Sequence, residues 1–74
     1  MASTWDESYA RLLRWRDDPA GGKGQHCNVS SRVEYEGHRL GVWLSHQRGA
    51  KREGKLSEER SAKLQALVDV GQLW

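Results

Sequence analysis

The sequence predicts an all-α fold, a compact three-helix bundle with a long loop between its first and second helices. Apolar residues recur at helical spacing in three separate segments, no alternating pattern is long enough for a sheet, and glycine and proline gather between the first two segments. The expected helices cover about 4–17, 39–52 and 57–70. At 74 residues the chain should form a single domain, 1–74, and we expect it to be excised from a longer protein.

The first expected helix, at about 4–17, carries one apolar stripe. Its members recur at i, i+4, i+7 and i+8: Trp5, Tyr9, Leu12 and Leu13. Pro19 restricts the residue before it, and the Gly21-Gly22 pair disfavours any continuation of the helix. The helix should therefore end near Asp17 or Asp18.

The four tryptophans are candidates either for filling a small core or for stacking on nucleobases. Trp5 and Trp43 lie on apolar stripes of their helices, and Trp74 follows the last helix, so we expect these three to pack against the core. Trp15 lies off the stripe of the first helix and between two arginines. We expect Trp15 to be the exposed tryptophan.

Residues 20–38 are rich in glycine, serine and polar side chains. Nearly twenty residues without regular structure are uncommon in a compact domain. The loop is therefore either functional or partly ordered by its few apolar residues, Val29, Val33 and Tyr35. A short strand over 32–35 is an alternative with little support, and the sequence leaves the conformation of this loop open.

The second expected helix, at about 39–52, has an apolar beginning and a basic end. Its inner face consists of Leu40, Trp43, Leu44 and Gln47. Gly41 has no side chain, so the first helix or the loop can approach closely there, beside the large Trp43. Arg48, Lys51 and Arg52 follow toward the other end. The helix macrodipole favours cations at a C-terminus, so their position alone does not indicate a ligand.

The third expected helix, at about 57–70, has clear start and stop residues. Ser57 can cap it, and Glu58 and Glu59 stand in the first turn, where the positive end of a helix favours acids. The inner face continues through Arg60, Leu64, Leu67 and Val68. Gly71 ends the helix, and Gly54 closes the turn that precedes it.

The positive charge of the chain is concentrated in its middle. There are 12 Lys plus Arg and 10 Asp plus Glu, a net charge of only +2. Residues 21–55 hold seven basic and three acidic side chains, whereas the segments on either side each carry one excess negative charge. A local basic field can attract phosphate or anionic lipid, although it is also typical of an ordinary solvated face.

Catalytic and cofactor sites find no support in the sequence. The possible metal ligands are His26, Cys27, His38 and His46, and their spacing is not that of a zinc site. The Gly21–Gly24 run lacks the spacing of a nucleotide-binding loop, and no nucleophile has a matching base and orienter. We expect no metal, no cofactor and no catalysis. A single cysteine excludes an intrachain disulfide, and no apolar run approaches a membrane span, so we expect a cytoplasmic protein without membrane contact.

A set of residues in order along nearly the whole chain forms a more specific pattern. It consists of Trp5, Tyr9, Leu12 or Leu13, Asn28-Val29, Glu36-Gly37, Leu40-Gly41-Val42-Trp43-Leu44, Gln47-Arg48, Gly54-Lys55-Leu56-Ser57, Glu59-Arg60, Leu64, Leu67 and Trp74. This pattern resembles the helicase-associated domain, a small module often found behind the motor domains of bacterial DEAD/DEAH-type helicases. The LGxWLxxQR block followed by GKLSxER is its most specific part. Ser30 stands where the family usually has proline, and the element at 17–22 is altered.

The resemblance implies a three-helix, non-catalytic accessory module that binds nucleic acid, DNA rather than RNA, for a helicase-like parent protein. Phosphate contacts are expected from a basic rim on the second helix and the following turn, extended from the loop. The candidate residues are Arg48, Lys51, Arg52, Lys55, Arg39, Lys23, Arg32 and Trp15. Arg48 has an alternative role, bracing the fold through Glu53, Glu58 or Glu59. The alternative function is protein docking, onto the helicase motor or a neighbouring repeat, through Trp15 and the apolar remainder of the third helix. We expect a monomer.

Overall fold

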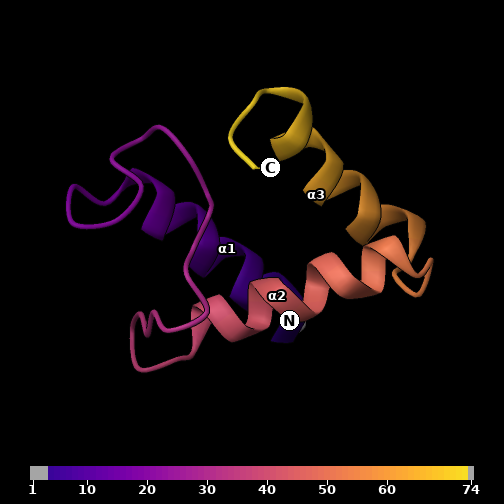
Figure 1. Cartoon of the computed structure of the whole chain (residues 1–74), viewed down its shortest axis with the longest axis horizontal. Helices are drawn as coiled ribbons and strands as arrows, with labels where there is room; N and C mark the ends of the chain where they lie inside the picture. The colour runs from indigo at the N-terminus through magenta and orange to yellow at the C-terminus, as the bar shows by residue number, and fades with distance from the viewer. Residues whose placement is uncertain (1–3, 74) are drawn as a thin grey trace.

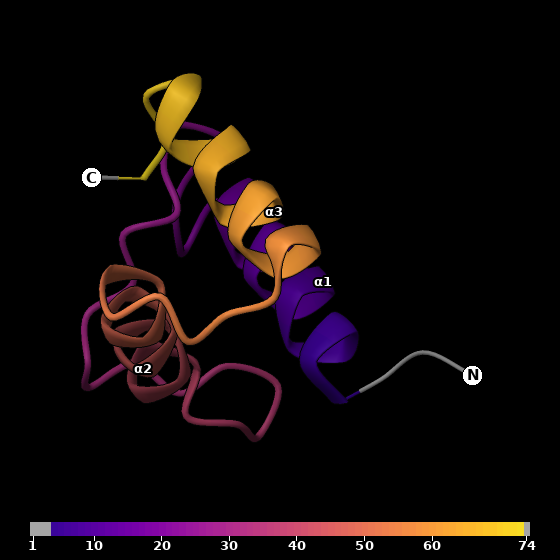
Figure 2. The ribbon, with the colours of Figure 1, turned by 90° about the vertical axis from the view of Figure 1, so that its right-hand side faces the viewer.

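The computed structural model describes residues 4–73 and contains three helices in this range. These are α1 (Thr4–Asp17), α2 (Leu40–Arg52) and α3 (Glu58–Asp69). The predicted all-α fold is confirmed, and every helix boundary lies within one residue of its expected position. α2 runs across one side of the molecule, and α1 and α3 both lie on the same side of it (Figures 1 and 2). None of the helices in residues 4–73 is long and apolar enough to cross a membrane.

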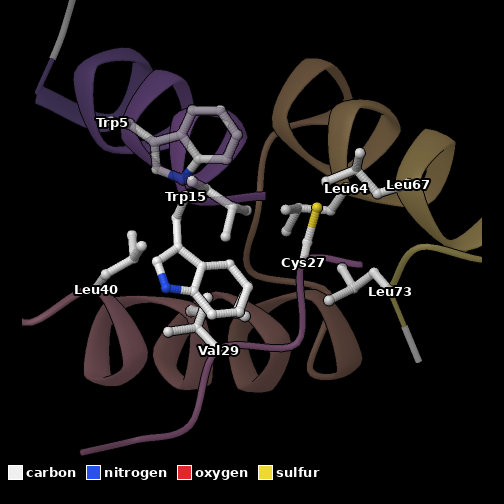
Figure 3. Packing of buried hydrophobic residues seen from close by; sticks show 10 residues of the cluster. Trp5, Trp15, Cys27, Val29, Leu40, Leu64, Leu67 and Leu73 are labelled. Atoms are coloured by element: carbon white, nitrogen blue, oxygen red, sulfur yellow. The ribbon is translucent and has the colours of Figure 1, made fainter. Parts of the chain in front are cut away.

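The core lies where the three helices face one another and is closed by the loop and the C-terminal segment. Its buried apolar residues are Trp5, Leu12, Trp15, Cys27, Val29, Leu40, Leu44, Leu64, Leu67 and Leu73. Figure 3 shows Cys27 and Val29 entering this cluster from the loop, so loop residues complete the core beside the three helices. Cys27 also donates its backbone N–H to the Gln72 carbonyl at 2.6 Å. The loop and the C-terminal segment are thereby joined.

The buried face of α1 differs from the predicted stripe. It consists of Trp5, Ser8, Leu12 and Trp15, whereas Tyr9 and Leu13 are half-buried beside it. The expectation that Trp15 is exposed was wrong, because its side chain is only 8% exposed. Trp15 follows Leu12 by three residues and so lies on the same helix face. The loop folds over it: the His26 ring meets its indole edge-on at 5.6 Å, and the Gly22 N–H donates to its carbonyl.

The loop between α1 and α2 is ordered by apolar anchors and by pairs with α1. Val29 is buried, and Val33 and Tyr35 pack partly buried against the core, which agrees with one of the two expectations for this loop. The strand suggested for 32–35 does not form; an isolated antiparallel bridge joins Tyr35 to His38 instead. The Tyr35 hydroxyl donates to the Asp18 carboxylate at 2.9 Å.

Glu36 fastens the last part of the loop to α1. Arg14 donates to both of its carboxylate oxygens, and Arg11 Nε lies 3.5 Å from one of them. The Arg14 hydrogen bonds hold the pKa of Glu36 below its ordinary value of 4.5. A carboxyl whose pKa is lowered by folding stabilises the fold above its unfolded-state pKa and loses that contribution as the pH falls through its folded-state pKa.

A Glu36→Gln variant should therefore be less stable than the parent chain at about pH 7, and the difference should be smaller at about pH 3. The difference arises because only the ionised carboxylate accepts the charged Arg14 pair. Urea unfolding followed by circular dichroism at both pH values measures it. Glu34→Gln is the matched control, since Glu34 is also a loop carboxylate and has no ion pair within residues 4–73. A stability difference that persists unchanged at the lower pH would contradict this assignment.

A close approach at Gly41 was predicted, by either the first helix or the loop, and in the structure it is the loop that meets α2 there. A Cβ built on Gly41 would lie 1.7 Å from the Ser30 carbonyl oxygen, so the loop backbone occupies the space of a side chain. At the other end of α2, Gly54 adopts a φ of 73° in the turn toward α3. Ser57 then caps α3 by accepting the Arg60 N–H at 3.2 Å, which confirms the predicted start of that helix.

Candidate functional site

The basic end of α2 borders a groove that separates it from α3. Arg48, Lys51 and Arg52 supply one side of this groove, since residues spaced by three or four share a helix face. Its apolar floor consists of Leu64 and Val68 of α3 together with Leu73. The hollow has a volume of about 210 Å³. Three of the eight predicted site residues are thus brought together on one feature.

Two of the three cations of this groove are held by neutral groups. Arg48 donates from Nη2 to the Asn28 side-chain carbonyl, and Lys51 Nζ donates to Gln65 Oε1 at 2.8 Å. The Arg52 side chain is exposed and has neither a hydrogen bond nor an ion pair within residues 4–73. Arg48 therefore braces the fold, but through the amide of Asn28 and not through the three glutamates considered from the sequence. An amide fixes the direction of a cation without cancelling its charge.

Cations elsewhere in the described chain are commonly paired with acids. Ion pairs to carboxylates involve Arg11, Arg14, Arg16, Lys55 and Lys63. Lys63, for example, lies 3.2 Å from the Asp6 carboxylate. These pairs cancel much of the positive field where they occur. Lys23, Arg32 and Arg39 also have no ion pair within residues 4–73, so the groove differs from these positions in bringing three such cations together on one feature.

The other predicted site residues are dispersed. Lys55 is exposed in the turn after α2, where it pairs with Glu53 at 3.1 Å, and it does not line the groove. Arg39 and Arg32 are exposed near the opposite end of α2. The 13 steps from Arg39 to Arg52, at about 1.5 Å each, separate the two ends by about 20 Å. Lys23 is exposed in the turns after α1, with a φ of 56°.

Two aromatic expectations bear on the site. The burial of Trp15 removes its indole from any stacking surface and also from the docking surface considered as the alternative. Trp74 lies outside the described residues. A second hollow, of about 270 Å³, lies beside Trp15, but Asp18 and Glu34 line it. Two carboxylates disfavour a polyanionic ligand in that place.

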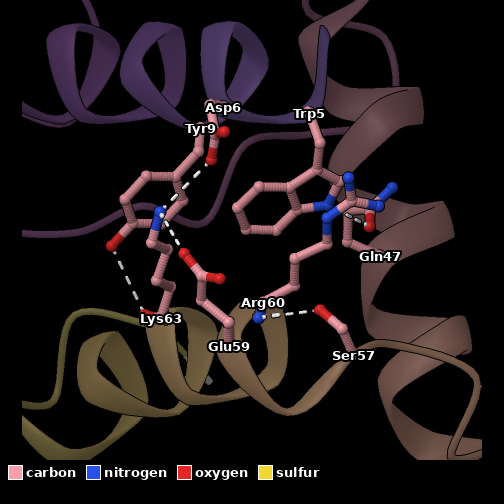
Figure 4. Close-up of polar contacts among 8 residues, drawn as sticks. All are labelled: Trp5, Asp6, Tyr9, Gln47, Ser57, Glu59, Arg60 and Lys63. Atoms are coloured by element: carbon pink, nitrogen blue, oxygen red, sulfur yellow. Dashed lines mark hydrogen bonds and ion pairs between the residues drawn. The ribbon is translucent and has the colours of Figure 1, made fainter. Parts of the chain in front are cut away.

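Several residues of the sequence pattern serve the fold. Trp5 stacks on Tyr9 at a centroid distance of 5.4 Å and donates its indole N–H to Gln47 Oε1 at 2.7 Å (Figure 4). From α3, the Arg60 guanidinium lies 5.3 Å from the centre of the Trp5 ring. Lys63 reaches the same stack, with Nζ 5.8 Å from the Trp5 ring. Gln47 and Arg60 thus join all three helices around one indole.

The remaining candidates for reactive chemistry are Cys27 and the possible metal ligands among the described residues. Burial raises the pKa of the Cys27 thiol, which keeps it protonated and unreactive at neutral pH. In the described part of the chain, no three His, Cys, Asp or Glu side chains come together in a group that could hold a metal ion.

Sequence reasoning found the cations of the groove but missed its floor and its amides. Val68 was expected on the inner face of α3, yet it is 40% exposed. Its spacing of four residues from Leu64 places both on one helix face, so the sequence carried no signal that Leu64 is buried and Val68 is not. No pattern in the sequence links Asn28 to Arg48 or Gln65 to Lys51.

Comparison with known protein families agrees with the architecture. The family described as "Helicase associated domain" matches residues 2–72, which is nearly the whole chain. No curated protein and no solved structure matches the chain. Proteins of this family serve helicases as accessory modules, which is the role the resemblance implied. Because this match covers nearly the whole chain, and the three helices agree with the fold that the resemblance implied, the chain belongs to the helicase-associated domain family.

Proposed function

We propose that this chain is an accessory nucleic-acid-binding module of a helicase-like protein. It contacts the phosphate backbone through Arg48, Lys51 and Arg52, with Lys55 next to them. The observation that carries the proposal is the charge at the groove: two cations are oriented by neutral amides, and Arg52 has no intramolecular partner in residues 4–73. Phosphate groups can supply these three cations with the negative charge that no carboxylate of the described residues supplies.

The ligand proposed is DNA rather than RNA, and sequence preference should be weak because phosphate contacts carry no sequence information directly. Arg39, Arg32 and Lys23 join the interface if the strand follows α2 along its length. An Arg39→Ala variant tests this extension. It should weaken binding only when the oligonucleotide is long enough to span both ends of the helix.

Binding of a fluorescently labelled oligonucleotide should weaken steeply between about 50 mM and 200 mM salt. Three to four phosphate contacts give a log-log slope of about 2 to 3.5, because each contributes roughly 0.7 on a single strand and 0.9 on a duplex. Arg52→Ala should lower the slope by about 0.7 to 0.9, the share of one phosphate contact, and should weaken binding to all sequences alike. Fluorescence anisotropy measures both quantities.

The control must change the net charge equally without touching the groove. Ala66→Glu does so, because Ala66 is exposed and lies two residues from both Leu64 and Val68, about 200° around α3 from each. This variant should bind almost as the parent does. Equal weakening by Ala66→Glu and Arg52→Ala would show that only total charge matters, and absence of binding at low salt would refute the proposal for the isolated domain.

The alternative function, docking onto the helicase motor or a neighbouring repeat, is favoured by one observation. Val68 is 40% exposed and Val70 67% exposed toward the end of α3. Docking through such a surface would change little with salt, whereas phosphate contacts are screened. The same salt series therefore separates the two functions.

A further inference from the structure

The groove between α2 and α3 combines cations with apolar surface, and a phosphate group alone would contact only the cations. Cations border it, but its floor is made of Leu64, Val68 and Leu73. Leu64 and Leu73 are almost fully buried, so Val68 provides most of the exposed apolar surface. Figure 3 shows Leu64 and Leu73 turned toward the space between α3 and α2. An inorganic anion would leave this apolar surface in water.

The occupant that matches both chemistries is a nucleotide unit of a single strand. We infer that one unstacked base enters this groove and lies on the Val68 side chain while its flanking phosphates contact Lys51 and Arg52. This inference rests on the proposed function and adds the strand form and the part of the nucleotide that is recognised. Unstacked bases are held on aromatic side chains or arginine planes, and in some pockets between aromatic and apolar side chains.

The size of the groove favours one base over a base pair. Its volume of about 210 Å³ lies below the roughly 300–1,000 Å³ of pockets that bury drug-sized ligands, which fits a single heterocycle better than a base pair. In a duplex the bases are stacked and paired, so their faces cannot reach the floor. A duplex can still contact the rim through its phosphates. The groove should therefore prefer a single strand to a duplex of the same sequence.

Two of the three rim cations are oriented before any ligand arrives. The Asn28 amide holds Arg48, and Gln65 holds Lys51 while donating its own Nε2 to Asp69 at 2.9 Å. Of the three rim cations, Arg52 alone lacks a partner among the described residues. A base can stack against an oriented guanidinium with little loss of side-chain entropy. The short floor also argues against an acidic peptide as occupant, because a helix or extended peptide needs a longer apolar surface than Val68 and its neighbours provide.

The first test uses the unaltered protein and two probes. One is a single-stranded deoxythymidine oligonucleotide of about ten nucleotides, and the other is the same backbone without bases. The base-containing strand should bind several-fold more tightly at equal salt, because only a base can cover the exposed part of Val68 and remove that apolar surface from water. The salt slopes of the two probes should be equal, since their phosphates are the same.

A pair of matched variants places the effect in the groove. Val68→Gln should weaken binding of the deoxythymidine strand several-fold and leave binding of the abasic strand unchanged, because it removes the apolar surface on which the base lies. Val70→Gln makes the same substitution at a more exposed valine outside the groove and should change neither. Circular dichroism and urea unfolding confirm that both variants keep the fold.

The outcomes distinguish this inference from the proposed function. Equal, salt-dependent binding of both strands would overturn base insertion while leaving phosphate binding intact. A duplex bound more tightly than the single strand would also overturn it. If neither strand binds at low salt, both proposals fail, and binding of an alternating Glu-Leu peptide in their place would assign the groove to protein docking.

Discussion

Replacing Gly41 with alanine should strongly destabilise the domain. The new Cβ would lie 1.7 Å from the Ser30 oxygen and 2.8 Å from the Ser31 Cα, both backbone atoms that cannot rotate away. Overpacking costs about 1–3 kcal/mol and sometimes more, and here the loop itself must move, so we expect about 3 kcal/mol. A core this small supplies only about 3–5 kcal/mol in total. The variant should be largely unfolded, as measured by urea titration of the helical circular dichroism signal.

Gly49 provides the matched control in the same helix. A Cβ on Gly49 meets nothing within 4 Å, so alanine there adds helix propensity without a clash. Gly49→Ala should stabilise the domain by about 0.5–1 kcal/mol. The same substitution thus has opposite signs at two positions of α2. A Gly41→Ala variant as stable as Gly49→Ala would show that the loop does not press against α2.

Removing the Trp5 side chain should have the second large effect. Trp5 is 7% exposed and joins the three helices through Tyr9, Gln47 and Arg60. Trp5→Ala should cost about 3–5 kcal/mol, the usual loss for a buried large aromatic. Trp5→Phe keeps the stack but leaves the Gln47 oxygen without its donor, and should cost about 1–2 kcal/mol. Thermal and urea unfolding by circular dichroism compare the two.

Trp43 serves as the reference for that measurement. It lies 5.7 Å from Trp5, but it is only partly buried. Trp43→Ala should therefore cost less than Trp5→Ala, although the two residues are the same size and belong to the same cluster. Equal losses at both positions would mean that the contacts of Trp5 with all three helices add nothing to its contribution.

The helices could be predicted because their signals are local. Apolar periodicity, the Ser57 cap and the terminal glycines each act within one or two turns, and they placed all three helices to within a residue. The position of Trp15 was mispredicted because its neighbouring arginines suggested solvent, while its spacing from Leu12 already placed it on the buried face. Flanking charge says little about a side chain that points the opposite way around a helix.

The contacts of the loop and of the site amides could not be predicted either, and the reason differs from that for Trp15. Arg14 with Glu36, Tyr35 with Asp18, and Arg48 with Asn28 are pairs of residues distant in sequence. Such contacts depend on how the helices and loop pack, and a single sequence carries no periodic signal for them. The cations of the groove were therefore visible in the sequence, whereas the reason they stay uncompensated was not.

The hydrogen bond between Cys27 and Gln72 has a consequence for cooperativity. Cys27 precedes Asn28, which holds Arg48 at the rim of the groove, and Gln72 precedes Leu73 on its floor. Rim and floor therefore meet through one short stretch of the loop. Local opening of that stretch would release Arg48 at the rim and Leu73 on the floor together, whereas Lys51 would stay tied to α3 through Gln65. The least regular segment of the domain thus couples one residue of the rim to one residue of the floor.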